Sequence, residues 1–109
     1  MPGKFELKKS RGQFMFNLKA TNGRVILTSE RYKSKASAMN GIESVRKNSK
    51  VKGGFDRRTA KDKSPYFVLE AKNGETIGRS EMYSSKAAME NGIASVQKNA
   101  PKAGLNDLT

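Results

Sequence analysis

The feature that most constrains the fold of this chain is an internal duplication. When the sequence is shifted by 51 residues, residues 14–49 align with residues 65–100 without a gap. A chain of 109 residues has the usual size of one domain, so the two copies must share one core. We therefore interpret residues 1–109 as a single domain made of a first repeat, residues 1–52, and a second repeat, residues 53–109.

Each copy predicts three strands. Apolar and polar residues alternate in the central strand of each copy, which is typical of a strand with one buried face. The Asn-Gly pairs that follow favour a two-residue hairpin turn in which both residues have positive φ. The predicted strands cover residues 5–9, 14–20 and 25–29 in the first copy, and 55–59, 67–71 and 76–80 in the second.

A helix follows the strands in each copy, over residues 35–48 and 86–99. Ser34 and Ser85 stand where an N-cap belongs. The glycines in the middle of the helices, Gly41 and Gly92, each cost about 1 kcal/mol against alanine and so predict a close backbone approach. A short strand is also predicted near Leu105.

One repeat alone would be a three-stranded sheet with one covering helix, which buries too little to be stable. Two repeats side by side, related by a pseudo-twofold axis, solve this problem, as a homodimer does. The predicted fold class is therefore α+β, with one sheet and two helices on one face of it.

Three paired motifs make the chain resemble the bacterial YegP-like family. They are Ala-x-Asn-Gly, Ser-Glu-x-Tyr-x-Ser-Lys-Ala and Asn-Gly-Ile-x-Ser-Val-x-Lys-Asn, each of which occurs twice. The resemblance implies two β(3)-α-β repeats in a single antiparallel sheet that exchange their C-terminal strands. The segments near Phe55 and Leu108 would then each pair with the other repeat. The family has no established activity, so the resemblance implies no catalytic or binding residue.

The composition excludes most catalytic chemistry. The chain has no cysteine and no histidine, which removes thiolate sites, the commonest metal ligand and the commonest general base. Glu30 and Glu81 are the only carboxylates present in both copies, and their place before the helices suits a favourable interaction with the helix dipole. Gly53 and Gly54 lack the spacing of a phosphate loop. We expect no enzyme, no metal and no cofactor.

Neither a membrane-spanning run nor a signal-peptide pattern is visible in the sequence. We therefore expect a cytoplasmic protein. Because the duplication already fuses two units, we expect it to be a monomer.

Charge is the strongest functional signal. The net charge is +12, which favours polyanionic partners. Residues 1–52 hold 13 basic and 3 acidic residues, whereas residues 53–109 hold 9 basic and 7 acidic ones. Two copies of one fold that differ this much in charge indicate that the fold itself does not require the charge. The excess is either a polyanion-binding surface in the first repeat or drift on a solvated surface.

The face of the sheet away from the helices is the second functional signal. We expect it to carry Met15, Asn17, Lys19, Val25 and Leu27 from the first repeat and Tyr66, Val68, Glu70, Thr76 and Gly78 from the second. Such a face favours either nucleic acid, whose bases stack on aromatic rings while cations hold the phosphates, or another protein. The candidate phosphate contacts are Lys8, Arg11, Lys19 and Arg24, and the candidate stacking residue is Tyr66.

Overall fold

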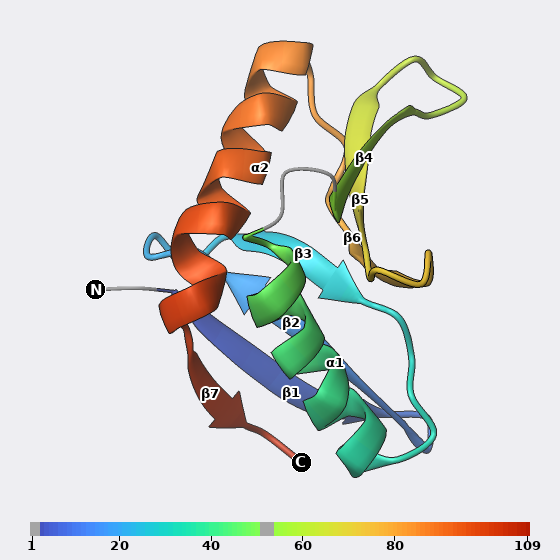
Figure 1. Ribbon diagram of the computed structural model, residues 1–109, viewed down its shortest axis with the longest axis vertical. Helices are drawn as coiled ribbons and strands as arrows, with labels where there is room; N and C mark the ends of the chain where they lie inside the picture. The colour runs from blue at the N-terminus through green and yellow to red at the C-terminus, as the bar shows by residue number, and fades with distance from the viewer. Residues whose placement is uncertain (1–2, 51–53) are drawn as a thin grey trace.

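Alternating apolar residues build the strands of a single sheet. The computed structural model describes residues 3–50 and 54–109, and within them the chain forms one seven-stranded sheet and two α-helices (Figure 1). The predicted α+β class is confirmed. The predicted boundary between residues 52 and 53 lies outside the described residues. The elements are β1 Lys4–Ser10, β2 Gln13–Lys19, β3 Val25–Ser29, α1 Lys35–Asn48, β4 Phe55–Thr59, β5 Pro65–Glu70, β6 Thr76–Arg79, α2 Lys86–Asn99, a 3-10 turn η2 Ala100–Lys102, and β7 Gly104–Asp107.

The strands lie in the order β4-β5-β6-β3-β2-β1-β7. All neighbours pair antiparallel except β1 and β7, which run parallel, so the prediction of a wholly antiparallel sheet is wrong at this edge. The prediction that the segment near Phe55 pairs with the other repeat is also wrong, because β4 pairs with β5 of its own half. The amide of Gly3 donates to Oδ1 of Asn99 at 2.9 Å. This bond ties the start of β1 to the end of α2, so β7 begins beside the start of β1 and runs in the same direction.

The hairpin turns differ from the predicted type. Gly23 and Gly74 have φ of 83° and 85°, but the asparagine before each of them does not have a positive φ. The amide of Gly23 donates to Ala20 O, and the amide of Ala20 donates to Arg24 O. This is the three-residue loop that ends in a glycine bulge. The two-residue turn with positive φ at both positions is instead Arg11-Gly12, with φ of 52° and 77°.

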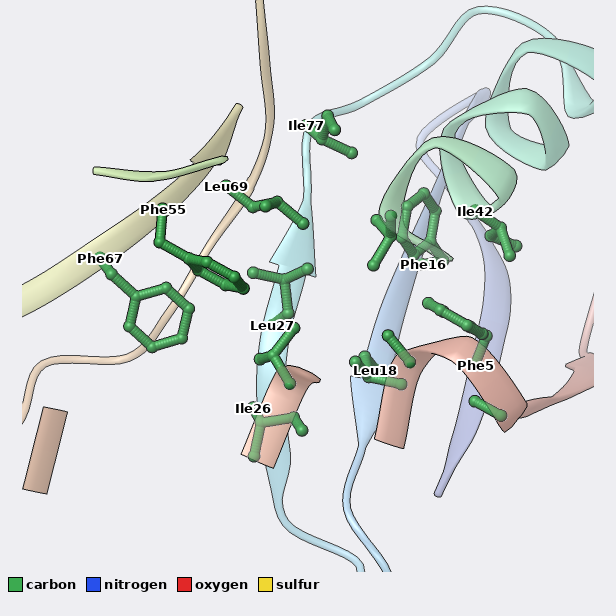
Figure 2. Close-up of a cluster of buried hydrophobic side chains, with 14 of the residues drawn as sticks. Phe5, Phe16, Leu18, Ile26, Leu27, Ile42, Phe55, Phe67, Leu69 and Ile77 are labelled. Carbon is green, nitrogen blue, oxygen red and sulfur yellow. The ribbon is translucent and has the colours of Figure 1, made fainter. Parts of the chain in front are cut away.

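A single cluster of apolar side chains joins sheet and helices. Phe5, Phe16 and Leu18 meet Ile42 of α1, and the same cluster contains Phe55, Phe67 and Leu69 (Figure 2). Ile26 and Leu27 lie between these two groups of side chains in the figure. The apolar stripe of α2, Met89, Ile93, Val96 and Ala100, is buried as the spacing predicted.

Leu27 and Gly78 were predicted on the outer face, and this is wrong. Leu27 is in register with the buried Leu18, and Gly78 with the buried Leu69, so both lie on the core side. The physical reason is a β-bulge in the β2–β3 pair and another in the β5–β6 pair, where the register shifts after Leu18 and after Leu69. A bulge turns two successive residues toward one face, which lets both Ile26 and Leu27 enter the core.

Both helices start as predicted. The hydroxyl of Ser34 accepts a bond from the amide of Ser37, and that of Ser85 accepts one from Ala88, each at 3.1 Å. The close approach predicted at the mid-helix glycines is also present, because the hydroxyl end of a tyrosine side chain lies against each glycine. A Cβ at Gly41 would lie 2.4 Å from the Tyr32 hydroxyl oxygen, and one at Gly92 would lie 2.2 Å from that of Tyr83.

The two halves of the described chain, residues 3–50 and 54–109, repeat their internal contacts. The ring of Phe16 stacks on Tyr32 with centroids 6.3 Å apart, and that of Phe67 stacks on Tyr83 at 6.2 Å. The amides of Phe16 and Phe67 donate to the hydroxyls of Ser29 and Ser80 at 2.9 and 3.0 Å. The residues common to both halves are thus used for folding.

Candidate polyanion-binding surface

One row of side chains crosses the whole sheet on the face opposite the core. Residues paired in register share a face, and successive residues alternate between faces. Glu6, Asn17 and Thr28 therefore point away from the core that Phe5, Leu18 and Leu27 form. The register of the six strand pairs extends this row across the sheet from β7 to β4. Its members are Asn106, Glu6, Asn17, Thr28, Arg79, Val68 and Asp56. The row mixes both signs of charge and is not itself a cationic surface.

Lys19 lies on this face, as predicted, but it is paired. Its Nζ lies 2.9 Å from Oε1 of Glu6, and Nζ of Lys4 lies 3.6 Å from Oε2 of the same carboxylate. The Glu6 side chain is only 9% exposed, and the bond from Lys19 holds its pKa below the ordinary range. A cation that already compensates a nearly buried carboxylate is poorly suited to bind a phosphate as well.

Arg24 lies at the turn between β2 and β3 and is also paired. Its Nη2 lies 3.2 Å from Oε1 of Glu81, across a groove of about 540 Å³ that Asn22, Tyr83 and Asn91 help to line. Both partners are well exposed, so this ion pair contributes little to stability. Glu30 pairs in turn with Arg79 at 3.7 Å. The carboxylates expected at the helix entries thus also hold arginines of the other half.

Lys8 and Arg11 lie at the opposite end of β1, where the structure gathers further cations. The turn Arg11-Gly12 closes the β1–β2 hairpin, and a backbone bridge from Phe14 to Tyr32 brings the segment before α1 beside it (Figure 1). Nη1 of Arg31 donates to Ser10 O at 3.4 Å. We call this group of residues the basic hairpin end: Lys8, Lys9, Arg11, Arg31 and Lys33.

The basic hairpin end is available to a ligand. Of its five members, all but the half-buried Lys8 are exposed. None of them forms a salt bridge within residues 3–50 and 54–109. Lys9 lies over the Phe14 ring, with Nζ 5.8 Å from its centroid, which places a cation and an aromatic side chain together.

The sequence reasoning missed Lys9, Arg31 and Lys33. Their signal was present, because the chain before α1 carries cations on both sides of Tyr32, a residue found in both copies. What the sequence did not reveal is the bridge between Phe14 and Tyr32 that carries this segment to the hairpin.

Tyr66 does not join the other candidates. It lies in β5 opposite Arg58, and three strands separate β5 from β1. The strands β5 and β1 are thus four strand spacings apart, which corresponds to roughly 19 Å. The five predicted residues therefore form no single site: Lys8 and Arg11 are together, Lys19 and Arg24 are at the other end of β2, and Tyr66 is in the other half.

The same region of the second half carries far less charge. The positions that correspond to Lys9, Arg31 and Lys33 hold Thr59, Met82 and Ser84. Arg58, which corresponds to Lys8, is bound by Asp56 with Nε 2.7 Å from Oδ2. Part of the difference in charge between the halves therefore lies at this end of the fold, where the hairpin loop of the second half still carries Lys61 and Lys63.

Burial raises the pKa of the Tyr32 and Tyr83 hydroxyls, which lie against the mid-helix glycines. Over residues 3–50 and 54–109, no three carboxylates lie close enough together to hold a metal ion. In the same described ranges, neither helix has the length and apolar character that crossing a bilayer requires.

Known proteins similar to this chain share its length and fold. A UPF0339 protein of Bordetella pertussis is 59% identical over 109 residues, covering 100% of this chain and 98% of that protein. The UPF0339 protein YegP of Yersinia pestis is 53% identical over 108 residues, covering 98% and 96%. The solution NMR structure of a UPF0339 protein from Shewanella oneidensis matches with a TM-score of 0.94 at 53% identity, covering 100% of this chain and 93% of that one.

A second solution NMR structure, of the protein of unknown function yegP from E. coli, also has a TM-score of 0.94, at 48% identity, and covers 100% of this chain and 95% of that one. The family profile described as "Domain of unknown function (DUF1508)" matches residues 10–53 and 60–107. The resemblance to the YegP-like family is thereby confirmed, and the chain belongs to the DUF1508 family, whose function is unknown.

Proposed function

We propose that this protein is a small binding module that holds a polyanion, nucleic acid in the first place, at the basic hairpin end. One observation carries the proposal: five cations from two distant segments lie at this end of the β1–β2 hairpin, with Lys8 and Lys9 on opposite faces of the sheet, and form no salt bridge among the described residues. Unpaired surface cations attract phosphates because binding releases the counterions that surround a nucleic acid. The proposed contacts are to phosphates, so binding would have little sequence preference.

We also infer that the fold is a pair of β(3)-α-β repeats related by a pseudo-twofold axis, with both helices on one face and the C-terminal strand β7 of the second repeat joined to the first. The register of the junction supports this, because Thr28 pairs with Arg79, the residue 51 positions later and hence its own counterpart. The pairing of β7 with β1 supports this placement of β7. In this arrangement the basic hairpin end is a feature of one repeat only.

The proposed binding involves no catalytic reaction. The absence of cysteine and histidine supports a role that is not enzymatic. A monomer in the cytoplasm remains our expectation for the working form. Nucleic acid would be accessible to it in that compartment.

The test exchanges the charged positions of the first half for the residues that the second half already uses. The variant Lys9→Thr, Arg31→Met, Lys33→Ser removes three charges and introduces side chains that the same fold accommodates at Thr59, Met82 and Ser84. Affinity for short single- and double-stranded oligonucleotides is measured by fluorescence anisotropy from low to moderate salt. We expect a loss of roughly tenfold or more at low salt, and a salt slope smaller by about 2 to 3.

A matched control removes the same charge elsewhere. In the variant Lys61→Ala, Lys63→Gly, Lys72→Thr the three cations are lost from loops of the second half. Its affinity should fall far less. Equal losses in the two variants would mean that net charge alone drives binding, and no binding by the native protein at low salt would overturn the proposal.

A further inference from the structure

The strand β7 of the second half packs against the first half, between the edge of β1 and the helix α1. It pairs with β1 in parallel, from Lys4 with Gly104 to Leu7 with Asp107 (Figure 1). A cation of α1 contacts each end of it. Nζ of Lys35 lies 2.5 Å from Oδ2 of Asp107, and Nη2 of Arg46 donates to Ala103 O at 2.7 Å.

The second half repeats this receptor for a strand. β4 corresponds to β1, since Phe55 pairs with Leu69 and packs edge-on against Phe67, with centroids 5.6 Å apart, as Phe5 pairs with Leu18 and packs against Phe16. In the described part of the chain, β4 ends the sheet and its outer edge pairs with no strand. An open edge presents backbone donors and acceptors that an added strand can satisfy.

A groove occupies the place where a strand would lie. It measures about 440 Å³ and is lined by Phe55 and Arg57 of β4 and by Glu90, Ile93, Ala94 and Gln97 of α2. A second groove of about 280 Å³ shares Arg57 and Glu90 with the first and extends to Lys86. The two grooves together run along β4 from Phe55 to Thr59.

The cations of the groove indicate what it would bind. Lys86 is the first residue of α2, as Lys35 is of α1, and it forms no salt bridge among the residues that the structure describes. Gln97 corresponds to Arg46 and can donate to a carbonyl in the same way. Arg57 replaces the buried Leu7 and is held by Glu90, with Nη2 2.9 Å from Oε1. A residue opposite Arg57 would thus face cations where Asp107 faces Lys35.

We propose that this groove binds an extended, acidic segment of another protein, which joins the sheet as a strand parallel to β4. The segment has the pattern of β7, a small residue, an apolar residue, a polar residue and then a carboxylate that faces Lys86. The chain's own β7 is at the opposite end of the sheet. Six strand spacings, roughly 29 Å, separate it from β4, so the occupant comes from another chain.

The probe is a peptide with the sequence of residues 103–109, Ala-Gly-Leu-Asn-Asp-Leu-Thr, with both ends blocked. The intact protein keeps its own β7 in place, because a tethered segment has a large effective concentration. Amide NMR shifts should therefore saturate at residues 55–59 of β4 and in the part of α2 that lines the groove. Replacing the aspartate of the peptide by asparagine should weaken binding about two- to fivefold, as for an exposed ion pair.

The protein variant Lys86→Met should bind the aspartate peptide more weakly by the same factor. It should bind the aspartate and asparagine peptides equally well. Lys98→Met, on the same helix but outside the groove, should bind like the native protein. Absence of saturable shifts at millimolar peptide, shifts confined to β1 and β7, or equal binding of the aspartate and asparagine peptides would overturn the proposal. Concentration-dependent shifts of the same β4 amides without peptide would also overturn it, since the occupant would then be a second copy of this chain.

Discussion

At the scale of single residues, the paired glycines show that a residue repeated in both halves of the chain can serve packing rather than binding. Gly41 and Gly92 let the stacked rings of Tyr32 and Tyr83 press their hydroxyl ends against the helix backbone. The helix gives up about 1 kcal/mol of intrinsic propensity at each position. In return, each tyrosine fills the space between its helix and the strand that carries Phe16 or Phe67.

The variant Gly41→Ala tests this packing. Its Cβ would lie 2.4 Å from Oη and 2.8 Å from Cζ of Tyr32, so the ring must move. We expect the free energy of unfolding, measured by urea titration, to fall by about 1 to 3 kcal/mol despite the better helix propensity of alanine.

Adding Tyr32→Phe should restore part of that loss, because it removes the hydroxyl but leaves the ring carbon. Asn40→Ala, an exposed change one residue away, should be neutral or slightly stabilising. If Gly41→Ala were as stable as the native protein, the tyrosine contact would not be the reason for the glycine.

Residue charge also explains why the candidate site was only partly predictable. The excess of cations in the first half is visible in the sequence, and Lys8 and Arg11 lie in the basic hairpin end that we propose as the binding surface. Lys19 and Arg24 were not predicted to be paired, because their partners Glu6 and Glu81 are 13 and 57 residues away and no local pattern reveals such pairs.

At the scale of elements, the two edges of the sheet are treated differently. β1 is covered by β7, and its Leu7 is fully buried. β4 carries Arg57 at the corresponding position, where a charge directed toward the helix side discourages unspecific strand pairing. We therefore expect the same residue to disfavour self-association at this edge.

The variant Arg57→Leu copies Leu7 onto the open edge. We expect it to self-associate, with an apparent mass in sedimentation velocity that rises with protein concentration, while the native protein stays monomeric. Arg58→Leu, the next residue of β4, points to the other face and should change the mass much less. A monomeric Arg57→Leu variant at high concentration would show that the charge does not protect the edge.

The elements themselves were the most predictable part of the fold. Strong periodicity and serine caps placed both helices to the residue. Three details escaped because they depend on partners outside the local sequence: the bulge that turns Leu27 inward, the glycine-bulge form of the Asn-Gly turns, and the parallel direction of β7.

At the scale of the whole molecule, the two halves are bound by more than their junction. β3 and β6 pair over only two residue pairs, Thr28 with Arg79 and Ser29 with Gly78. The core nevertheless forms one cluster that contains side chains of both halves. We therefore expect the whole chain to be stably folded and neither half to be stable alone.

Fragments of residues 1–52 and 53–109 test this expectation. Each fragment alone should give the circular dichroism of an unfolded chain, because a three-stranded sheet with one helix buries too little apolar surface. An equimolar mixture should regain native-like helix and strand signals. Leu27→Ser in the first fragment, which removes a side chain that is 1% exposed, should abolish the recovery. A second fragment that folds by itself would contradict the idea of a shared core.

The pairing of β7 with β1 also has a consequence for how the protein is made. Lys4 and its partner Gly104 are 100 residues apart, so the strand that covers β1 leaves the ribosome long after β1 itself. At about 5 to 20 residues per second, the first strand waits roughly 5 to 20 seconds for it. During that interval the nascent chain carries an apolar edge without its cover, and chaperones or neighbouring nascent chains would meet it there first.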